Sequence, residues 1–167
     1  MPKIALISDT HSYLDSKIFK YFEPCDEIWH AGDIGNTEIS DHLKTIRPLR
    51  AVYGNIDGTE LRKEFKKDLI FEIDQLKVYI THIGGYPGRY NQEALLTIKK
   101  EKPGLFICGH SHILKVMYDK QNSLLHMNPG AAGIHGFHKV KTLLRFDVLK
   151  GKIDNLEVIE LGLRAEL

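Results

Sequence analysis

Two short stretches of this chain each place two side chains that can bind a metal ion close together. Asp9-Thr10-His11 offers a carboxylate and an imidazole, and His110-Ser111-His112 offers two imidazoles. In an extended or turning loop, side chains that are one residue apart can both reach the same ion. Paired histidines at this spacing are uncommon in ordinary turns, so both stretches indicate metal binding.

Three further candidates, Asp33, Asn55 and His82, each come shortly after an apolar run; His82, for example, directly follows Val78-Tyr79-Ile80-Thr81. Taken alone, Asp33 and Asn55 are explained by turns or helix caps, and His82 by a place in the core. Their joint occurrence is more informative, because ligands of open α/β sheets bind outside the carboxyl ends of the strands. The pattern therefore favours one shared site.

The complete set of candidate ligands combines carboxylate, amide and imidazole groups. Its members are Asp9, His11, Asp33, Asn55, His82, His110 and His112. Seven ligands are too many for one tetrahedral ion but suit two ions that share a bridging group, for which Asp33 is the natural candidate. Oxygen and imidazole ligands without thiolate suit Mn²⁺, Fe, Ni²⁺, Co²⁺ or Zn²⁺.

Short apolar runs that alternate with stretches of helical spacing must position these ligands. The predicted strands are Lys3–Ser8, Glu27–His30, Arg50–Tyr53, Leu69–Ile73, Lys77–Thr81, Leu105–Cys108, Leu114–Tyr118, Leu124–Met127, Leu143–Leu149 and Ile153–Glu160. The predicted helices are Asp15–Phe22, Thr37–Thr45, Thr59–Lys66 and Arg89–Glu101. The pattern indicates an α/β protein.

The order of these elements restricts the topology. The first three strands alternate with helices, which predicts parallel crossover units, whereas the segments 73–77 and 119–123 are typical of hairpin turns. A single mixed sheet, or two sheets packed face to face between helices, would satisfy both features. With 167 residues, 43% of them hydrophobic, the chain is predicted to form one domain over residues 1–167.

The composition excludes several classes of function. Lys and Arg number 23 against 22 Asp and Glu, so no overall basic field predicts a nucleic-acid partner. Cys25 and Cys108 lie far apart and indicate neither a disulfide framework nor a cysteine zinc site. Because the sequence shows neither a signal peptide nor a membrane span, we expect a cytoplasmic protein; homo-oligomerisation stays open.

The candidate ligands fall into five blocks: Asp-x-His, Gly-Asp, Gly-Asn-x-Asp, His, and Gly-His-x-His. In this order they resemble the calcineurin-like metallophosphoesterase superfamily, and Met127-Asn128-Pro129-Gly130 is similar to a segment of its small prokaryotic phosphodiesterase branch. The resemblance implies a four-layer α-β-β-α sandwich, in which two mixed sheets pack face to face and a dinuclear metal site lies at the carboxyl ends of the strands.

The resemblance also implies roles for the ligands. One ion would be held by Asp9, His11, Asp33 and His112. The other would be held by Asp33, Asn55, His82 and His110, the four residues that we also predict to be catalytic. The implied activity is hydrolysis of phosphodiester bonds in a small or exposed substrate, with Mn²⁺ as the leading candidate metal. The alternatives are a phosphomonoesterase or nucleotidase with the same centre, and a noncatalytic scaffold similar to the retromer subunit of this fold.

The predicted ligands fit the chemistry of diester hydrolysis. The negative charge of a phosphodiester repels hydroxide, whereas a water between two dications should lose its proton near neutral pH and become the attacking, metal-bridging hydroxide. Two dications, the carboxylates of Asp9 and Asp33 and this hydroxide would leave a charge of about +1 to receive a monoanionic diester. As a neutral ligand, Asn55 preserves this charge.

The chain departs from the wider superfamily at Ile56, where many members have a histidine that protonates the leaving group. General acid assistance is typically worth about 10²–10⁴-fold in rate, so the departure favours substrates with good leaving groups. His135 and His138 are candidate substitutes, although solvated loop histidines are the simpler interpretation. For Asp57, orientation of a neighbouring ligand and helix capping are about equally plausible.

Overall fold

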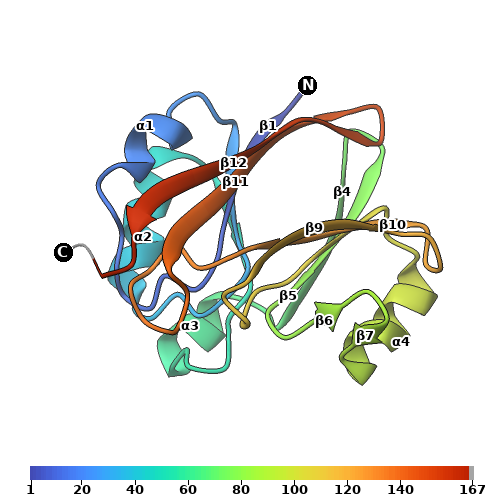
Figure 1. The fold of residues 1–167 in the computed structure, drawn as a ribbon, viewed down its shortest axis with the longest axis horizontal. Helices are drawn as coiled ribbons and strands as arrows, with labels where there is room; N and C mark the ends of the chain where they lie inside the picture. Colours follow the sequence, from blue (N-terminus) through green and yellow to red (C-terminus); the bar gives the residue numbers. More distant parts are fainter. Residues whose placement is uncertain (166–167) are drawn as a thin grey trace.

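The computed structural model describes residues 1–165, which form two five-stranded sheets, a two-stranded hairpin and four helices (Figure 1). The first sheet has the strand order β12-β11-β1-β2-β3. Its strands are β1 (Lys3–Ile7), β2 (Glu27–His30), β3 (Leu49–Ala51), β11 (Val140–Leu149) and β12 (Lys152–Leu163). As predicted from their alternation with helices, β1, β2 and β3 are parallel, whereas β11 runs antiparallel to both of its neighbours.

The second sheet has the order β4-β5-β8-β10-β9. Its strands are β4 (Asp68–Ile73), β5 (Leu76–Thr81), β8 (Leu105–Ile107), β9 (Leu114–Asp119) and β10 (Leu124–Pro129). The three central strands are parallel, and β4 and β9 join them as antiparallel edges through the two predicted hairpins. The carboxyl ends of β5 and β8 therefore lie at one edge of this sheet, where His82 and His110 follow them.

The helices lie outside the two sheets (Figure 1). They are α1 (Ile18–Phe22), α2 (Thr37–Ile46), α3 (Thr59–Glu64) and α4 (Gln92–Glu101). Phe22 of α1 and Leu43 of α2 pack against the outer face of the first sheet, and Ile98 of α4 packs with Phe106 of the second. No helix within residues 1–165 has the length and apolar character needed to cross a membrane.

Apolar side chains from both sheets form the central layer. Leu6 and Trp29 of the first sheet share a buried cluster with Val78 and Ile107 of the second. The alternate residues of β1, such as Ala5, face the helices and are equally buried. Burial on both faces explains why the central strands read as continuous apolar runs. The predicted four-layer α-β-β-α sandwich is thus confirmed.

One predicted helix is wrong at its beginning. We expected a helix over Arg89–Glu101, but Arg89–Tyr90 forms strand β7 and pairs with β6 (Gly85–Tyr86). The helix begins only at Gln92, because the side chain of Asn91 accepts a hydrogen bond from the backbone N–H of Glu93 and caps it. The apolar spacing of α4 was visible in the sequence, but a two-residue strand carries too little pattern to be recognised.

Several other boundaries differ by a few residues. The helix expected from Asp15 begins at Ile18. The Asp15 carboxylate instead accepts a hydrogen bond from the backbone N–H of Lys17 and forms an ion pair with Lys141. Strand β3 covers Leu49–Ala51, earlier than predicted, and β12 extends to Leu163 because Leu163 pairs with Val140 of β11.

Candidate metal centre

The candidate ligands lie in loops that hydrogen bonds tie to one another. The backbone N–H of Asp9 donates to the carbonyl of Gly32, and that of His11 donates to the carbonyl of Asp33, at 3.0 Å each. In the second sheet, the N–H of Gly109 donates to the carbonyl of His82 at 2.9 Å. The first two contacts join the loop after β1 to the loop after β2, and the third joins the loop after β5 to the loop after β8.

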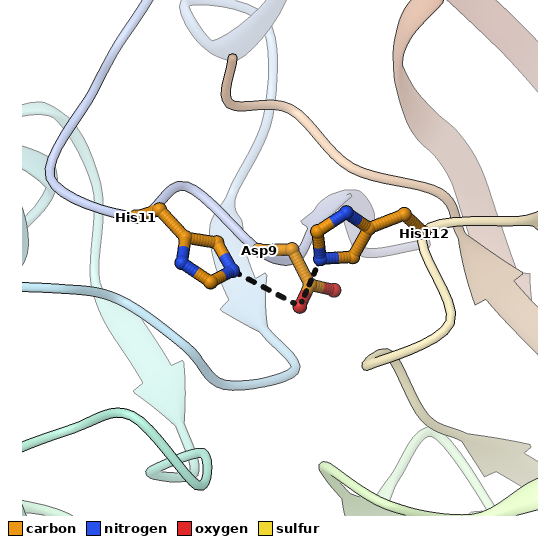
Figure 2. Close-up of side chains that lie close together, drawn as sticks. All are labelled: Asp9, His11 and His112. Atoms are coloured by element: carbon orange, nitrogen blue, oxygen red, sulfur yellow. Dashed lines mark ion pairs between the residues drawn. The ribbon is translucent and has the colours of Figure 1, made fainter. Parts of the chain in front are cut away.

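The first group of ligands consists of Asp9, His11 and His112. Their ligand atoms lie within 4.8 Å of one another. Figure 2 shows both imidazoles directed at one carboxylate oxygen of Asp9, with Nε2 to Oδ1 distances of 3.7 Å for His11 and 3.1 Å for His112. Two imidazoles and a carboxylate that converge in this way are suited to a divalent transition metal.

The second group consists of Asp33, His82 and His110, again with ligand atoms within 4.8 Å of one another. Asp33 Oδ2 lies 3.1 Å from His82 Nε2 in this group and 3.4 Å from His11 Nε2 in the first. The Asp33 carboxylate therefore lies between the two groups. This position is the one that a bridging ligand requires.

Three buried polar atoms of the site have no hydrogen-bond partner among residues 1–165: Asp9 Oδ1, His11 Nε2 and His82 Nε2. Leaving such atoms unpaired costs roughly 1–3 kcal/mol each, so native structures rarely contain a cluster of them. All three point into the space between the two groups, where a cation would accept their lone pairs. The residues present therefore fit two divalent ions.

The backbone at the site adopts an uncommon conformation. The ligands Asp9, His11, Asp33, His110 and His112 all have positive φ, between 45° and 69°. Residues with a Cβ rarely occupy this left-handed region, and such outliers cluster at functional sites where the surrounding structure holds them in place. The left-handed backbone conformation of these five residues is consistent with a site in which the fold fixes the direction of each ligand side chain.

Two glycines allow the backbone to come close to the carboxylates. A Cβ on Gly54 would lie 2.0 Å from Asp33 Oδ1, and a Cβ on Gly109 would lie 2.1 Å from the Ser8 hydroxyl and 2.8 Å from Asp9 Oδ2. No side chain fits at either position without displacing the site. Glycine is therefore required in the Gly-Asn and Gly-His blocks, because any larger side chain would clash with Asp33, Ser8 or Asp9.

Hydrogen bonds fix the orientation of the ligands. His82 Nδ1 lies 2.8 Å from the carbonyl of Ala31. Because a carbonyl only accepts, Nδ1 carries the hydrogen and Nε2 presents its lone pair to the centre in the neutral ring. Asp9 Oδ2 accepts from the Ser8 hydroxyl at 2.7 Å and from the His110 N–H at 3.1 Å, which leaves Oδ1 free.

Asp57 orients the ligand loops and does not cap a helix. Its carboxylate accepts backbone N–H groups from Ile34 at 3.1 Å, Gly35 at 2.8 Å and Gly54 at 2.8 Å. These bonds join the loop of Asp33 to the loop of Asn55, and α3 has no side-chain cap. Of the two roles left open by the sequence, the structure supports the first.

Asn128 holds the loop of two predicted ligands in place, a role that the sequence alone did not reveal. Its amide donates to the carbonyl of Gly109 at 3.0 Å and to the Ser111 hydroxyl at 3.2 Å, so it holds the loop that carries His110 and His112. The Met127-Asn128-Pro129-Gly130 segment marked it as notable, but only the folded chain shows which loop it contacts.

Electrostatic interactions keep the carboxylates ionised. Burial alone would raise the pKa of Asp9, but the His11 and His112 rings hold this pKa well below its usual range. Burial likewise opposes ionisation of Asp33, yet His82 lowers its pKa. Burial would lower the pKa of His82, and the neighbouring Asp33 and Asp9 raise it instead. In the absence of a metal, histidine protons are thus the available counter-charge.

His82 lines a cavity of about 420 Å³, and His11, Asp33, His110 and His112 line another of about 470 Å³. Asn55, the seventh predicted ligand, lines both; it is exposed and sits on the same loop as Ile56, whose N–H donates to Asp33 Oδ1 at 3.0 Å. His135 lines the larger cavity and its ring lies 4.8 Å from that of His11. His138 lines it too, but its Nε2 is occupied by the Gly133 carbonyl at 2.8 Å.

Two stacked mixed sheets carry carboxylate and imidazole groups at their shared strand ends, an arrangement that fits a family of metal-dependent phosphoesterases. The family model of the calcineurin-like phosphoesterase superfamily domain matches residues 2–151, and the chain belongs to this family. The relationship expected from the five sequence blocks is confirmed.

Individual relatives agree with this assignment. A probable metallophosphoesterase of Methanocaldococcus jannaschii is 35% identical over 135 residues, which are 77% of this chain and 67% of the relative. A solved archaeal phosphodiesterase has a TM-score of 0.73 at 25% identity, covering 95% of this chain and 99% of its own. Vps29 of Entamoeba histolytica complexed with Zn²⁺ has a TM-score of 0.71 at 16% identity, covering 96% and 99%, and shows the fold alone.

Proposed function

We propose that this chain is a phosphodiesterase that uses two divalent metal ions, with Mn²⁺ as the leading candidate. The observation that carries the proposal is the pair of ligand groups, Asp9-His11-His112 and Asp33-His82-His110, in which the buried atoms Asp9 Oδ1, His11 Nε2 and His82 Nε2 have no hydrogen-bond partner within the described residues. When bound, the two cations would activate a water for attack on phosphorus and offset the charge of the phosphate. The similar archaeal phosphodiesterase also supports this activity.

The residues of the chain contribute orientation and charge. Asp33 would hold both ions through its carboxylate, while Asp9 and His82 keep their free atoms aimed at the centre through the contacts of their other atoms. Asn55 would add an oxygen ligand without adding negative charge. Each fixed ligand lowers the reorganisation needed when charge develops on the phosphate oxygens.

The shape of the site favours diesters over monoesters. A diester carries two substituents on phosphorus, and two cavities are each lined by predicted ligands, with Asn55 in the lining of both. A monoester would need only one of them. The substrate of this proposal is small or exposed, since it must reach the ions through these cavities.

The experiment compares bis(p-nitrophenyl) phosphate with p-nitrophenyl phosphate, using purified protein loaded with Mn²⁺. We expect a higher kcat/KM for the diester and loss of turnover on chelation. Faster hydrolysis of the monoester would instead identify a phosphomonoesterase with the same centre. Absence of turnover with both esters at full metal occupancy would support a noncatalytic scaffold.

A further inference from the structure

Exposed apolar side chains line one of the cavities at the metal centre. The cavity of about 470 Å³ has His11, Asp33, His110 and His112 among its lining residues, together with Ile56, Ile113 and Phe137. These three apolar side chains are 47%, 60% and 102% exposed. Single exposed apolar residues are ordinary, but three that line one cavity form a patch that indicates a binding surface.

The other cavity has a different character. It measures about 420 Å³, and its lining combines Asn55 and His82 with the charged residues Arg62, Lys67, Asp68 and Glu93. Lys67 and Glu93 form an ion pair at 2.5 Å. Tyr53, Tyr79 and Ile83 line this cavity too, so the two cavities differ in the four charged side chains, which, apart from the predicted ligands, have no counterpart beside Ile56, Ile113 and Phe137 in the other lining.

Hydrogen bonds hold the loop that carries Phe137 in place. At its beginning, the Gly133 N–H donates to the Asp9 carbonyl at 3.1 Å. At its end, His138 Nε2 donates to the Gly133 carbonyl at 2.8 Å, and Arg164 Nε donates to the His138 carbonyl at 2.7 Å. The exposed ring is thus presented from an anchored loop, so a ligand that covers it pays little to order the backbone.

We propose that this cavity binds an apolar, preferably aromatic, group attached to the phosphate of the substrate. The proposal rests on the phosphoesterase function and adds a substrate class to it. The metal ligands would receive the phosphate, while Phe137 and Ile113 would contact the attached ring. The volume lies within the roughly 300–1,000 Å³ of small-molecule sites, and aromatic side chains on such sites favour stacked or edge-to-face rings.

The test compares the binding of phenylphosphonate and methylphosphonate to Mn²⁺-loaded protein by isothermal titration calorimetry. The two anions share the charged group and differ in the ring. We expect phenylphosphonate to bind about tenfold more tightly, because part of the ring leaves water. In Phe137→Ala and Ile113→Ala this advantage should fall to about twofold, while methylphosphonate affinity stays unchanged.

Ile83→Ala is the matched control. Ile83 directly follows the predicted ligand His82, as Ile113 follows His112, and it is 42% exposed, but it lines the cavity of about 420 Å³ and a smaller one of about 270 Å³ and is absent from the lining of the cavity that contains Phe137. We expect this variant to keep the tenfold advantage. Equal affinity for the two anions in the unmutated protein, an advantage unaffected by Phe137→Ala, or failure of both anions to bind would overturn the proposal.

The outcomes separate this proposal from the proposed function. If diesters are hydrolysed but the phenyl group gives no advantage, the apolar subsite is wrong and the phosphodiesterase stands. If no ester is hydrolysed but phenylphosphonate binds with an advantage that depends on Phe137, the subsite stands and the activity is wrong.

Discussion

Two buried carboxylates on the same connection, between β1 and α1, have opposite surroundings. Asp15 is 6% exposed and pairs with Lys141 Nζ at 2.7 Å, and Lys141 itself is 2% exposed. Asp9 is fully buried, and the basic side chains within ion-pair distance of it in the described part of the chain are histidines. Chain charges balance Asp15, whereas Asp9 depends on protons or on a cation from outside.

This difference separates a structural ion pair from a ligand site. Burial of an ion pair contributes little to net stability, but removal of one partner leaves a costly unpaired charge. At Asp15 the chain supplies the partner through a distant strand. At Asp9 and Asp33 the chain leaves partner positions open, which makes this region dependent on what binds there.

The largest effect is expected at Asp33, the proposed bridging carboxylate. Asp33→Ala should lower diesterase turnover by at least about a thousandfold, because it removes the ligand that would serve both ions. The variant should also lose most of the rise in melting temperature that Mn²⁺ gives the unmutated protein, measured by differential scanning fluorimetry. Retention of that rise would show that Asp33 does not hold metal.

The opposite behaviour is expected at the ion pair. Lys141→Met should destabilise the chelator-treated protein by about 2–4 kcal/mol, measured by urea unfolding, since Asp15 loses its partner. Although burial opposes it, the hydrogen bond from Lys141 lowers the pKa of Asp15. The double variant Lys141→Met with Asp15→Asn should recover part of the loss, and both variants should still respond to Mn²⁺. Unchanged stability in Lys141→Met would show that Asp15 does not depend on Lys141, and the proposed difference between Asp15 and Asp9 would be wrong.

A smaller effect tests the charge at the metal centre. Asn55→Asp should lower kcat/KM for the diester about tenfold, because the added negative charge opposes a monoanionic substrate. Metal content, measured by atomic emission, should not fall. Full activity at full metal occupancy would show that the residual positive charge is unimportant.

The smallest effect concerns pH in the chelator-treated protein. Because the pKa of His82 is raised, its contribution to stability is complete below its unfolded pKa of about 6.5 and is lost as pH rises through its folded pKa. The unfolding free energy should therefore fall as the pH rises above about 6.5, and His82→Gln should show a smaller fall. The stabilisation by Mn²⁺ should instead increase as the pH rises, since protons compete with the metal for the histidines. Identical pH slopes in the two proteins would contradict this assignment.

The comparison also shows what the sequence could predict. The loops after β1, β2, β5 and β8 were predictable, because continuous apolar runs that end in Asp or His mark buried strands with polar carboxyl ends. The run Ile28-Trp29-His30 before Asp33 belongs to such a strand, and His30 is fully buried, with its Nε2 2.9 Å from the Thr10 hydroxyl and its Nδ1 accepting the Gly32 N–H at 3.1 Å. Burial lowers the pKa of this histidine to about 4.

The supporting contacts could not be predicted in the same way. Asp57 reaches residues 22 and 23 positions away, Lys141 reaches Asp15 over 126 positions, and Asn128 reaches Gly109 over 19. No periodicity or spacing encodes such pairs, since they arise only when the strands take their places in the sheets. The short β6-β7 hairpin was missed for a related reason, because its pairing depends on close approach of the backbone.

The two ligand groups take their members from both layers of the sandwich. Asp9, His11 and Asp33 follow strands of the first sheet, whereas His82, His110 and His112 follow strands of the second. A cation bound to either group would thus link the first sheet to the second. Each group is complete only when the two sheets are packed together, so we expect chelation to weaken the contact between the sheets at this edge.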